Sequence, residues 1–142
     1  MKAGIGVSIS FGCALVAALV AGTGCNKDTN IYGLWQGDRD WKELHLDNEE
    51  VARAYAAVNL NLKPDGTFVL TYATIPFEGN WVESGTAINL EVLSVLNRSL
   101  ERQQESVKKQ ADFTVRYENG KMFFKNVLDT KEIELKKKTK PN

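Results

Sequence analysis

Few side chains in this 142-residue chain have the types and spacing that catalysis or metal binding requires. The only histidine is His45, and the two cysteines, Cys13 and Cys25, both fall in the first 25 residues. A zinc site needs several nitrogen, sulfur or carboxylate ligands around one ion, and histidine is the most frequent general base. We therefore expect no metal, no cofactor and no thiol chemistry in the body of the chain.

His45 has carboxylates on either side of it. Glu43, His45 and Asp47 alternate along the chain and would share one face of a strand. Three ligands on one strand cannot surround an ion alone, and the chain has no second histidine to complete the coordination. We expect His45 to be a solvated residue and not a ligand.

Paired carboxylates are the remaining route to acid–base catalysis. Two pairs are close in sequence, Asp38 with Asp40 and Glu49 with Glu50. Glu49 and Glu50 are better explained as charges that stabilise the start of a helix, and Asp38 with Asp40 as loop residues. No nucleophile elbow or phosphate-binding loop is present in the sequence. We expect the protein not to be an enzyme.

Composition limits the partners further. The chain has 18 basic and 18 acidic side chains, with 25% charged and 43% hydrophobic residues. These fractions are typical of an ordinary globular domain. A balanced charge gives no overall field that would attract nucleic acid, so we expect no nucleic-acid partner.

The leader indicates where the protein resides. No charge separates Lys2 from Lys27, and the apolar run between them ends in Ala21-Gly22-Thr23-Gly24 directly before Cys25. A charged start, an apolar run and small residues form the layout of a secretory signal peptide. The following cysteine resembles that of a bacterial lipobox, where the thiol is acylated and becomes the mature N-terminus. Lipoboxes usually have Leu, Val or Ile three positions before the cysteine, whereas this chain has Gly22.

This pattern predicts the organisation of the chain. We expect residues 1–24 to be a lipoprotein signal peptide, Cys25 to carry the lipid, and residues 25–30 to be a polar tether. The protein would then be anchored in the bacterial cell envelope, facing the periplasm or the exterior. An uncleaved membrane anchor and plain secretion are the alternatives.

From Ile31 onward, period-two patterning broken by turn signals predicts one mainly β domain over residues 31–138. Turns are expected at Lys63–Thr67, Ser84-Gly85 and Asn119-Gly120. Their registers place apolar residues opposite one another: Leu62 with Phe68, Trp81 with Ile88, Tyr117 with Met122, and Val115 with Phe124. The pattern predicts about eight strands, near residues 31–36, 59–63, 67–74, 79–83, 86–93, 111–118, 121–127 and 132–138.

Two insertions interrupt the strands. The first, from Asp47 to Val58, has a capping residue at Asp47 or Asn48 and predicts a helix that packs on the sheet through Val51, Tyr55 and Val58. The second, Ser94 to Gln110, places Leu96, Leu100 and Val107 at helical spacing and predicts a solvated helix or a mobile loop. Eight short strands in a meander favour a closed up-and-down antiparallel barrel, which has no exposed sheet edge.

Three motifs carry a resemblance to a known family. Gly33-Leu34-Trp35 opens the first strand, the run LNLKPDGTF follows at Leu60–Phe68, and Gly79-Asn80-Trp81 comes next. This succession resembles the bacterial lipocalin-like lipoproteins, whose domains run G-x-W, L-x-F/L-x-x-D-G-T-F and G-x-W. The resemblance covers most of residues 31–93, and it implies a cup-shaped barrel that holds a small apolar molecule, with Trp35 as a plug at its closed end. The Cys-x-x-Cys of related envelope-stress lipoproteins is absent.

The candidate ligand-binding residues are the other inward aromatic residues, Tyr72, Trp81, Tyr117 and Phe124. They would either line a ligand cup or fill the barrel as an ordinary core, since an eight-stranded barrel has room for side chains or for one small ligand. We expect Trp81 to be the central core residue. We expect Tyr72 to lie at the barrel mouth, where water or ligand would satisfy its hydroxyl group.

Two functions follow from this fold. The first is an envelope lipoprotein that binds a small apolar molecule inside the barrel, under the segment from Ser94 to Gln110. The second is a non-catalytic structural or interaction lipoprotein with a solid barrel and an envelope protein as partner, which an outward Phe123 opposite Arg116 would favour. An interior void of about 300 Å³ or more would favour the first. The basic run Lys136–Lys140 fits a frayed tail or a contact with anionic lipid.

Overall fold

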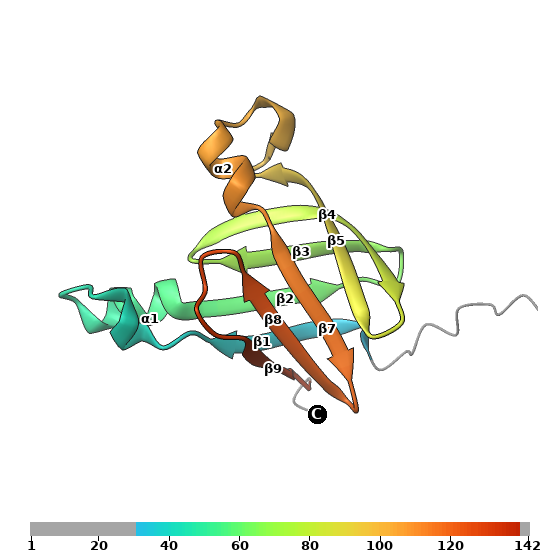
Figure 1. Cartoon of the computed structure of the whole chain (residues 1–142), viewed down its shortest axis with the longest axis horizontal. Coiled ribbons are helices and arrows are strands. Elements are labelled where there is room, and N and C mark those ends of the chain that lie inside the picture. Colours follow the sequence, from blue (N-terminus) through green and yellow to red (C-terminus); the bar gives the residue numbers. More distant parts are fainter. Residues whose placement is uncertain (1–30, 140–142) are drawn as a thin grey trace, which may run out of the picture.

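The computed structural model describes residues 31–139, which form a closed antiparallel barrel (Figure 1). The predicted leader, the lipid attachment site at Cys25 and the tether lie outside the described residues. Eight strands follow one another around the ring, and pairing between β4 and β5 and between β1 and β9 closes it. They are β1 (Gly33–Asp38), β2 (Ala57–Leu62), β3 (Thr67–Tyr72), β4 (Ile75–Ser84), β5 (Ala87–Val95), β7 (Phe113–Glu118), β8 (Lys121–Asn126) and β9 (Ile133–Lys137).

Short elements occupy the two insertions. The first insertion forms the 3-10 helix η2 (Trp41–Leu44) and the helix α1 (Glu49–Ala56). The second forms the two-residue strand β6 (Arg98–Ser99), the 3-10 helix η3 (Leu100–Arg102) and the helix α2 (Glu105–Gln110). β6 pairs with β5 alone. The predicted mainly β barrel with a helix after the first strand is confirmed.

The meander gives the barrel two distinct ends. We call the end where β1 begins the N-terminal pole; it also holds the β2–β3, β4–β5 and β7–β8 turns. The opposite end, the far pole, holds α1, α2 and the β8–β9 loop, and Figure 1 shows α1 standing away from the barrel wall there. Within residues 31–139, no helix is long and apolar enough to cross a bilayer.

The hairpin registers test the turn predictions. Leu62 lies opposite Phe68, and Val115 lies opposite Phe124, as predicted. Asn119 and Gly120 both have positive φ, at 53° and 77°, as a two-residue hairpin turn of this type requires.

The predicted partner of Trp81 is wrong. Trp81 lies opposite Leu90 and not Ile88, because Ser84 pairs with Ala87 and leaves Gly85-Thr86 as the loop. Gly85, with a φ of 60°, takes the first loop position instead of the second. The shift is two residues, so every side chain keeps its predicted face.

Gly79 marks a place where only glycine fits. A Cβ atom built on Gly79 would lie 1.8 Å from the carbonyl oxygen of Glu91 on the neighbouring strand. The β4–β5 register slips at this point, between Glu78 and Gly79. A bulge of this kind increases the local twist, which helps a sheet of few strands to close.

The helix α1 does not pack as predicted. Asn48 caps it by accepting a hydrogen bond from the backbone N–H of Val51, but the side chains of Val51 and Tyr55 are each 43% exposed. Ala52 and Ala56 are the buried residues of this helix. Because α1 stands off the barrel and contacts η2, its small residues and not its large ones are covered. Val58 is buried as predicted, but within β2.

The second insertion is largely solvent-exposed, as predicted, but it is not one helix or loop from Ser94, because Ser94 and Val95 still belong to β5. Leu100 and Val107 pack against the barrel core, whereas Leu96 is exposed and has a φ of 53°. The basic run is only partly a tail. Lys136 and Lys137 belong to β9, and the backbone N–H of Lys138 donates to the carbonyl oxygen of Leu34.

Candidate functional site

Aromatic rings fill the barrel at the far pole. Phe113 lies at the centre of this group, with ring centroids 4.9 Å from Phe77, 5.8 Å from Tyr72 and 5.6 Å from Phe124. Tyr72 and Phe124 are themselves 5.7 Å apart. These are the separations of aromatic rings in contact, and all four side chains are buried. The end of the barrel where the sequence predicts a mouth is therefore packed as a core.

The hydroxyl group of Tyr72 is satisfied by protein side chains. It donates to Asp129 Oδ1 at 2.7 Å and accepts from Arg39 Nη1 at 3.1 Å. Arg39 also lies over the Tyr72 ring, 4.4 Å from its centroid, and forms an ion pair with Asp129 at 3.7 Å. The prediction that water or a ligand satisfies this hydroxyl is wrong. We call these three residues the Tyr72 cluster.

The β8–β9 loop holds Asp129 in place. The backbone N–H of Asn126 donates to Asp129 Oδ2 at 2.9 Å, and Asn126 is itself buried. The Asn126 side chain donates to the carbonyl oxygens of Gln110 and Asp112 and accepts from the backbone N–H of Leu128. Both carboxylate oxygens of Asp129 thus have partners, and the loop is tied to the end of α2.

Electrostatics keep Tyr72 in its neutral form. Burial raises the pKa of the Tyr72 phenol well above its ordinary value, and the hydrogen bond to the Asp129 carboxylate raises it further. The nearby Arg39 opposes this shift in the pKa with a smaller effect. The phenol therefore stays protonated at neutral pH and serves as a hydrogen-bond donor.

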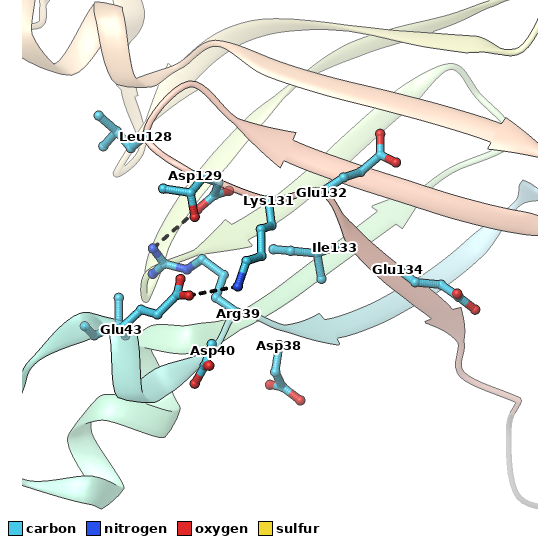
Figure 2. Close-up of a pocket in the computed structure, with 12 residues that line it drawn as sticks. Asp38, Arg39, Asp40, Glu43, Leu128, Asp129, Lys131, Glu132, Ile133 and Glu134 are labelled. Carbon is cyan, nitrogen blue, oxygen red and sulfur yellow. Dashed lines mark hydrogen bonds and ion pairs between the residues drawn. The ribbon is translucent and has the colours of Figure 1, made fainter.

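A cleft of about 450 Å³ lies outside the Tyr72 cluster, between the end of β1, η2 and the β8–β9 loop (Figure 2). Lys131 crosses it and donates to Glu43 Oε1 at 3.0 Å. Two basic residues, Arg39 and Lys131, line the cleft together with six acidic ones: Asp38, Asp40, Glu43, Asp129, Glu132 and Glu134. Of the residues that the structure describes, no three His, Cys, Asp or Glu side chains are grouped as metal ligands would be.

The carboxylates considered for catalysis have structural contacts. Asp40 caps η2 by accepting from the backbone N–H of Lys42, and Asp38 ends β1 at the edge of the cleft. Glu49 accepts from Arg53 within α1 at 2.7 Å. His45 is exposed and ends η2 with a φ of 49°. These placements agree with the helix-start and solvated interpretations made from the sequence, but the prediction of Asp38 as a loop residue is wrong, because Asp38 pairs with Ala57 as the last residue of β1.

The N-terminal pole is built around Trp35. Its indole Nε1–H donates to the carbonyl oxygen of Ile31 at 2.8 Å, and its ring meets Tyr117 edge-on with centroids 5.9 Å apart. Trp35 is buried and Tyr117 is half-buried. Lys137 Nζ lies 5.8 Å from the Trp35 ring centroid. Trp35 thus occupies the end of the barrel that the resemblance assigns to a plug.

A notch opens beside Trp35, between β8 and β9. The two strands pair from Met122 with Leu135 to Phe124 with Ile133, and no pair is formed beyond Met122 toward the N-terminal pole. The resulting pocket has a volume of about 450 Å³. Its lining is Trp35, Tyr117, Gly120, Lys121, Glu134, Leu135, Lys136 and Lys137. We call this pocket the β8–β9 notch.

Trp81 has a structural position at the same pole. It is 2% exposed, and its Nε1–H donates to the carbonyl oxygen of Lys63 at 3.0 Å. Its backbone N–H donates to the carbonyl oxygen of Gly66, and Tyr32 packs edge-on against its ring. Trp81 therefore joins the β2–β3 turn to the core.

The structure does not bring the predicted ligand residues to one place. Tyr72 and Phe124 are in contact at the far pole, Tyr117 contacts Trp35 at the N-terminal pole, and Trp81 packs with Tyr32. Phe123 lies opposite Arg116 as predicted, but it is half-buried and the Arg116 guanidinium lies 4.0 Å from its ring centroid. Phe123 is therefore not a bare apolar contact site.

Sequence reasoning missed Arg39, Asp129 and Lys137. Arg39 and Asp129 lie outside the strands, where no periodicity indicates the direction of a side chain. Lys137 did have a signal, because Ile133, Leu135 and Lys137 alternate on the face that carries the core. Comparison of the chain with family models, with curated proteins and with solved structures finds no match.

Proposed function

We propose that this protein is a lipid-anchored, non-catalytic protein of the bacterial cell envelope, whose solid barrel is a scaffold for contact with another envelope component. The observation that carries this proposal is the filled far pole. There four aromatic rings are in contact beneath the Tyr72 cluster. The alternative, storage of a small apolar molecule in the barrel, needs space where these rings lie.

The packing supports a solid interior. A protein core packs at the density of an organic crystal, and each of the ring contacts at the far pole has the separation expected of such packing. A ligand entering from this pole would have to displace Phe113 or break the bonds between Tyr72, Asp129 and Arg39. The pocket at this pole lies outside those bonds, at the cleft between η2 and the β8–β9 loop.

The chemistry of the cleft supports a non-catalytic role. A general acid or base needs a pKa close to the working pH and a free position next to a substrate. The pKa of Tyr72 is moved away from neutrality, and both oxygens of Asp129 accept hydrogen bonds from Tyr72 and from the Asn126 backbone. The polar groups of the Tyr72 cluster are thus used to hold the barrel end together.

The surface around the cleft fits a contact with a protein. Val127 and Leu128 are 59% and 62% exposed on the β8–β9 loop, and Leu128 lines the acidic cleft. A contiguous apolar patch rimmed by polar residues marks an interaction site, and these two neighbouring side chains are the start of such a patch. The excess of carboxylates favours a partner segment that is basic.

The location rests on the leader. The charge-free run that ends in Gly22-Thr23-Gly24-Cys25 supports export and acylation at Cys25. Cells grown with radiolabelled fatty acid should label the wild-type protein and not the Cys25→Ser variant. Equal labelling of the two proteins would contradict the anchor.

The solid interior is tested by offering the barrel an apolar probe. We expect native mass spectrometry of the full-length wild type, purified from its own host, to show neither a retained small molecule nor binding of p-xylene. Phe113→Ala, which removes the central ring of the far pole, should bind p-xylene; Phe113→Leu makes a smaller void in a more stable variant. Saturable binding by the wild type would instead support storage of a ligand.

A further inference from the structure

We propose that the β8–β9 notch binds the headgroup of an anionic phospholipid and so holds the N-terminal pole of the barrel against the membrane. This inference rests on the lipid anchor proposed above, and it adds a specific lipid contact and an orientation. The observations that support it are the place where the chain enters the barrel, the residues of the notch and the distribution of charge between the poles.

Few residues separate the proposed lipid attachment site from the barrel. Cys25 and Ile31 are six residues apart, and a fully extended chain of that length spans about 20 Å. The carbonyl oxygen of Ile31 accepts the hydrogen bond from Trp35 Nε1, and Trp35 lines the notch. An acylated Cys25 therefore keeps the notch close to the headgroup layer, whatever path the intervening residues take.

The lining of the notch combines apolar and basic residues. Trp35 and Leu135 are the buried apolar residues of its lining, the half-buried Tyr117 supplies accessible aromatic surface, and Lys121, Lys136 and Lys137 supply the positive charge. Lysine binds phosphate as a point charge, and tyrosine favours the boundary between water and hydrocarbon. The volume of about 450 Å³ lies within the range of small-molecule sites.

The local charge balance favours an anion. Among the described residues that line the notch, Glu134 alone is acidic, and Lys121 Nζ lies 3.8 Å from its carboxylate. That contact is at the long limit for an ion pair and both side chains are substantially exposed, so it does little to neutralise Lys121. Lys137 is placed over the Trp35 ring, which fixes one ammonium group at the apolar part of the lining.

Positive charge predominates around the notch, and negative charge predominates in the far-pole cleft. The turns of the N-terminal pole, the notch and the end of β9 carry five lysines against four carboxylates: Lys63, Lys121, Lys136, Lys137 and Lys138 against Asp65, Glu83, Glu118 and Glu134. One of these carboxylates, Glu118, pairs with Arg116 at 2.8 Å. Apart from Glu134, which also lines the notch, the far-pole cleft has five acidic residues against two basic ones. An anionic surface therefore attracts the N-terminal pole more than the acidic cleft of the far pole.

The test uses the full-length lipid-modified protein reconstituted into phosphatidylcholine vesicles with or without phosphatidylglycerol. A fluorophore is attached at Thr86→Cys, in the β4–β5 turn of the N-terminal pole, or at Val127→Cys, in the β8–β9 loop of the far pole. Nitroxide groups on lipid headgroups quench whichever label lies near the membrane. We expect quenching to be severalfold stronger at position 86 than at position 127, and to be strongest with phosphatidylglycerol.

Substitutions in the notch separate a lipid contact from simple tethering. Lys121→Gln combined with Lys136→Gln should remove the part of the quenching that depends on phosphatidylglycerol, since two lysines change attraction to an anionic surface by about 25-fold. Lys108→Gln combined with Lys109→Gln, which removes two lysines from α2 at the far pole, is the matched control and should leave it unchanged. The inference would be overturned if quenching did not depend on the charge of the lipid, or if it fell equally in the two double variants.

The same preparation distinguishes this inference from the anchor on which it rests. Intact mass spectrometry shows whether acyl chains are attached at Cys25. If they are absent, the proposed anchor fails and the lipid contact fails with it. If they are present while quenching is indifferent to Lys121 and Lys136, the anchor stands and the notch is not a headgroup site.

Discussion

The two ends of this barrel are closed by different means. At the far pole, a tyrosine hydroxyl, a guanidinium and a carboxylate are bonded to one another above a group of contacting aromatic rings. At the N-terminal pole, tryptophan indole groups donate to backbone carbonyl oxygens, and β8 and β9 separate to leave a notch. The barrel is therefore closed in two different ways, and only the N-terminal pole leaves part of an aromatic side chain accessible.

The far pole is packed where the sequence predicts a mouth. The sequence predicts a plug at Trp35 and a mouth at Tyr72, whereas the structure packs the Tyr72 end and opens a notch beside Trp35. The reason is that residues outside the strands supply the far-pole closure. Arg39 follows β1 and Asp129 belongs to the β8–β9 loop.

The largest expected effect is at Trp81, which joins the N-terminal pole to the core. Trp81→Ala should lower the free energy of unfolding by about 3–5 kcal/mol, because it removes a large buried ring and its hydrogen bond to the Lys63 carbonyl oxygen. Val82→Ala is the matched control, since Val82 is exposed and should change stability by less than about 0.5 kcal/mol. Denaturant unfolding measures both. Similar losses in the two variants would show that Trp81 is not the anchor of this pole.

A smaller effect is expected in the β7–β8 turn, which borders the notch. Gly120→Val should cost about 1–3 kcal/mol, because Gly120 has a φ of 77° and a branched side chain adopts that conformation only under strain. A Cβ atom at this position meets no other atom within 4 Å, so the cost is conformational and not steric. Gly120→Asn should lose less than half as much, because asparagine tolerates positive φ better. Equal losses for valine and asparagine would contradict the assigned turn.

Turn chemistry made much of the fold predictable. Asn119-Gly120 gives the β7–β8 register directly, because its preferred turn leaves two loop residues between paired strands. Ser84-Gly85 was less informative, because a glycine with positive φ fits either loop position. The predicted β4–β5 register was therefore wrong by two residues, although the predicted face of each side chain was right. Alternation survives such an error, so the buried face of each strand is more predictable than its partner.

The Tyr72 cluster was not predictable by the same reasoning. The hydrogen bond from Tyr72 joins residues 57 apart in sequence, and the one from Arg39 joins residues 33 apart. Neither turn chemistry nor periodicity relates positions at that separation when two of the three lie in loops. The position of Lys137 in the notch was more predictable, because alternation in β9 places Lys137 on the same face as Leu135.

The far pole should respond to loss of a single oxygen atom. Tyr72→Phe should lower the free energy of unfolding by about 1–2 kcal/mol, because it removes two hydrogen bonds and leaves Asp129 and Arg39 each short of one partner. Tyr55→Phe is the control, since the Tyr55 side chain is 43% exposed and should change stability by less than about 0.5 kcal/mol. Thermal and denaturant unfolding compare them. If Tyr72→Phe is as stable as Tyr55→Phe, the Tyr72 cluster does not close this pole.

The last prediction uses pH to isolate the same hydroxyl group. Burial and Asp129 raise the pKa of Tyr72 in the folded protein above the ordinary value of 10.0, so its contribution to stability is complete below about pH 10 and is lost as the pH rises further. In that alkaline range the unfolded chain releases the Tyr72 proton and the folded protein keeps it. The wild type should then lose about 1.4 kcal/mol of unfolding free energy per pH unit more than Tyr72→Phe, the linkage slope for one proton.

The other tyrosines and the lysines titrate in both proteins, so the difference between their two curves of stability against pH isolates this site. The wild type begins more stable, and the curves should converge as pH increases. Parallel curves measured by denaturant unfolding would show that Tyr72 ionises as freely in the folded protein as in the unfolded chain.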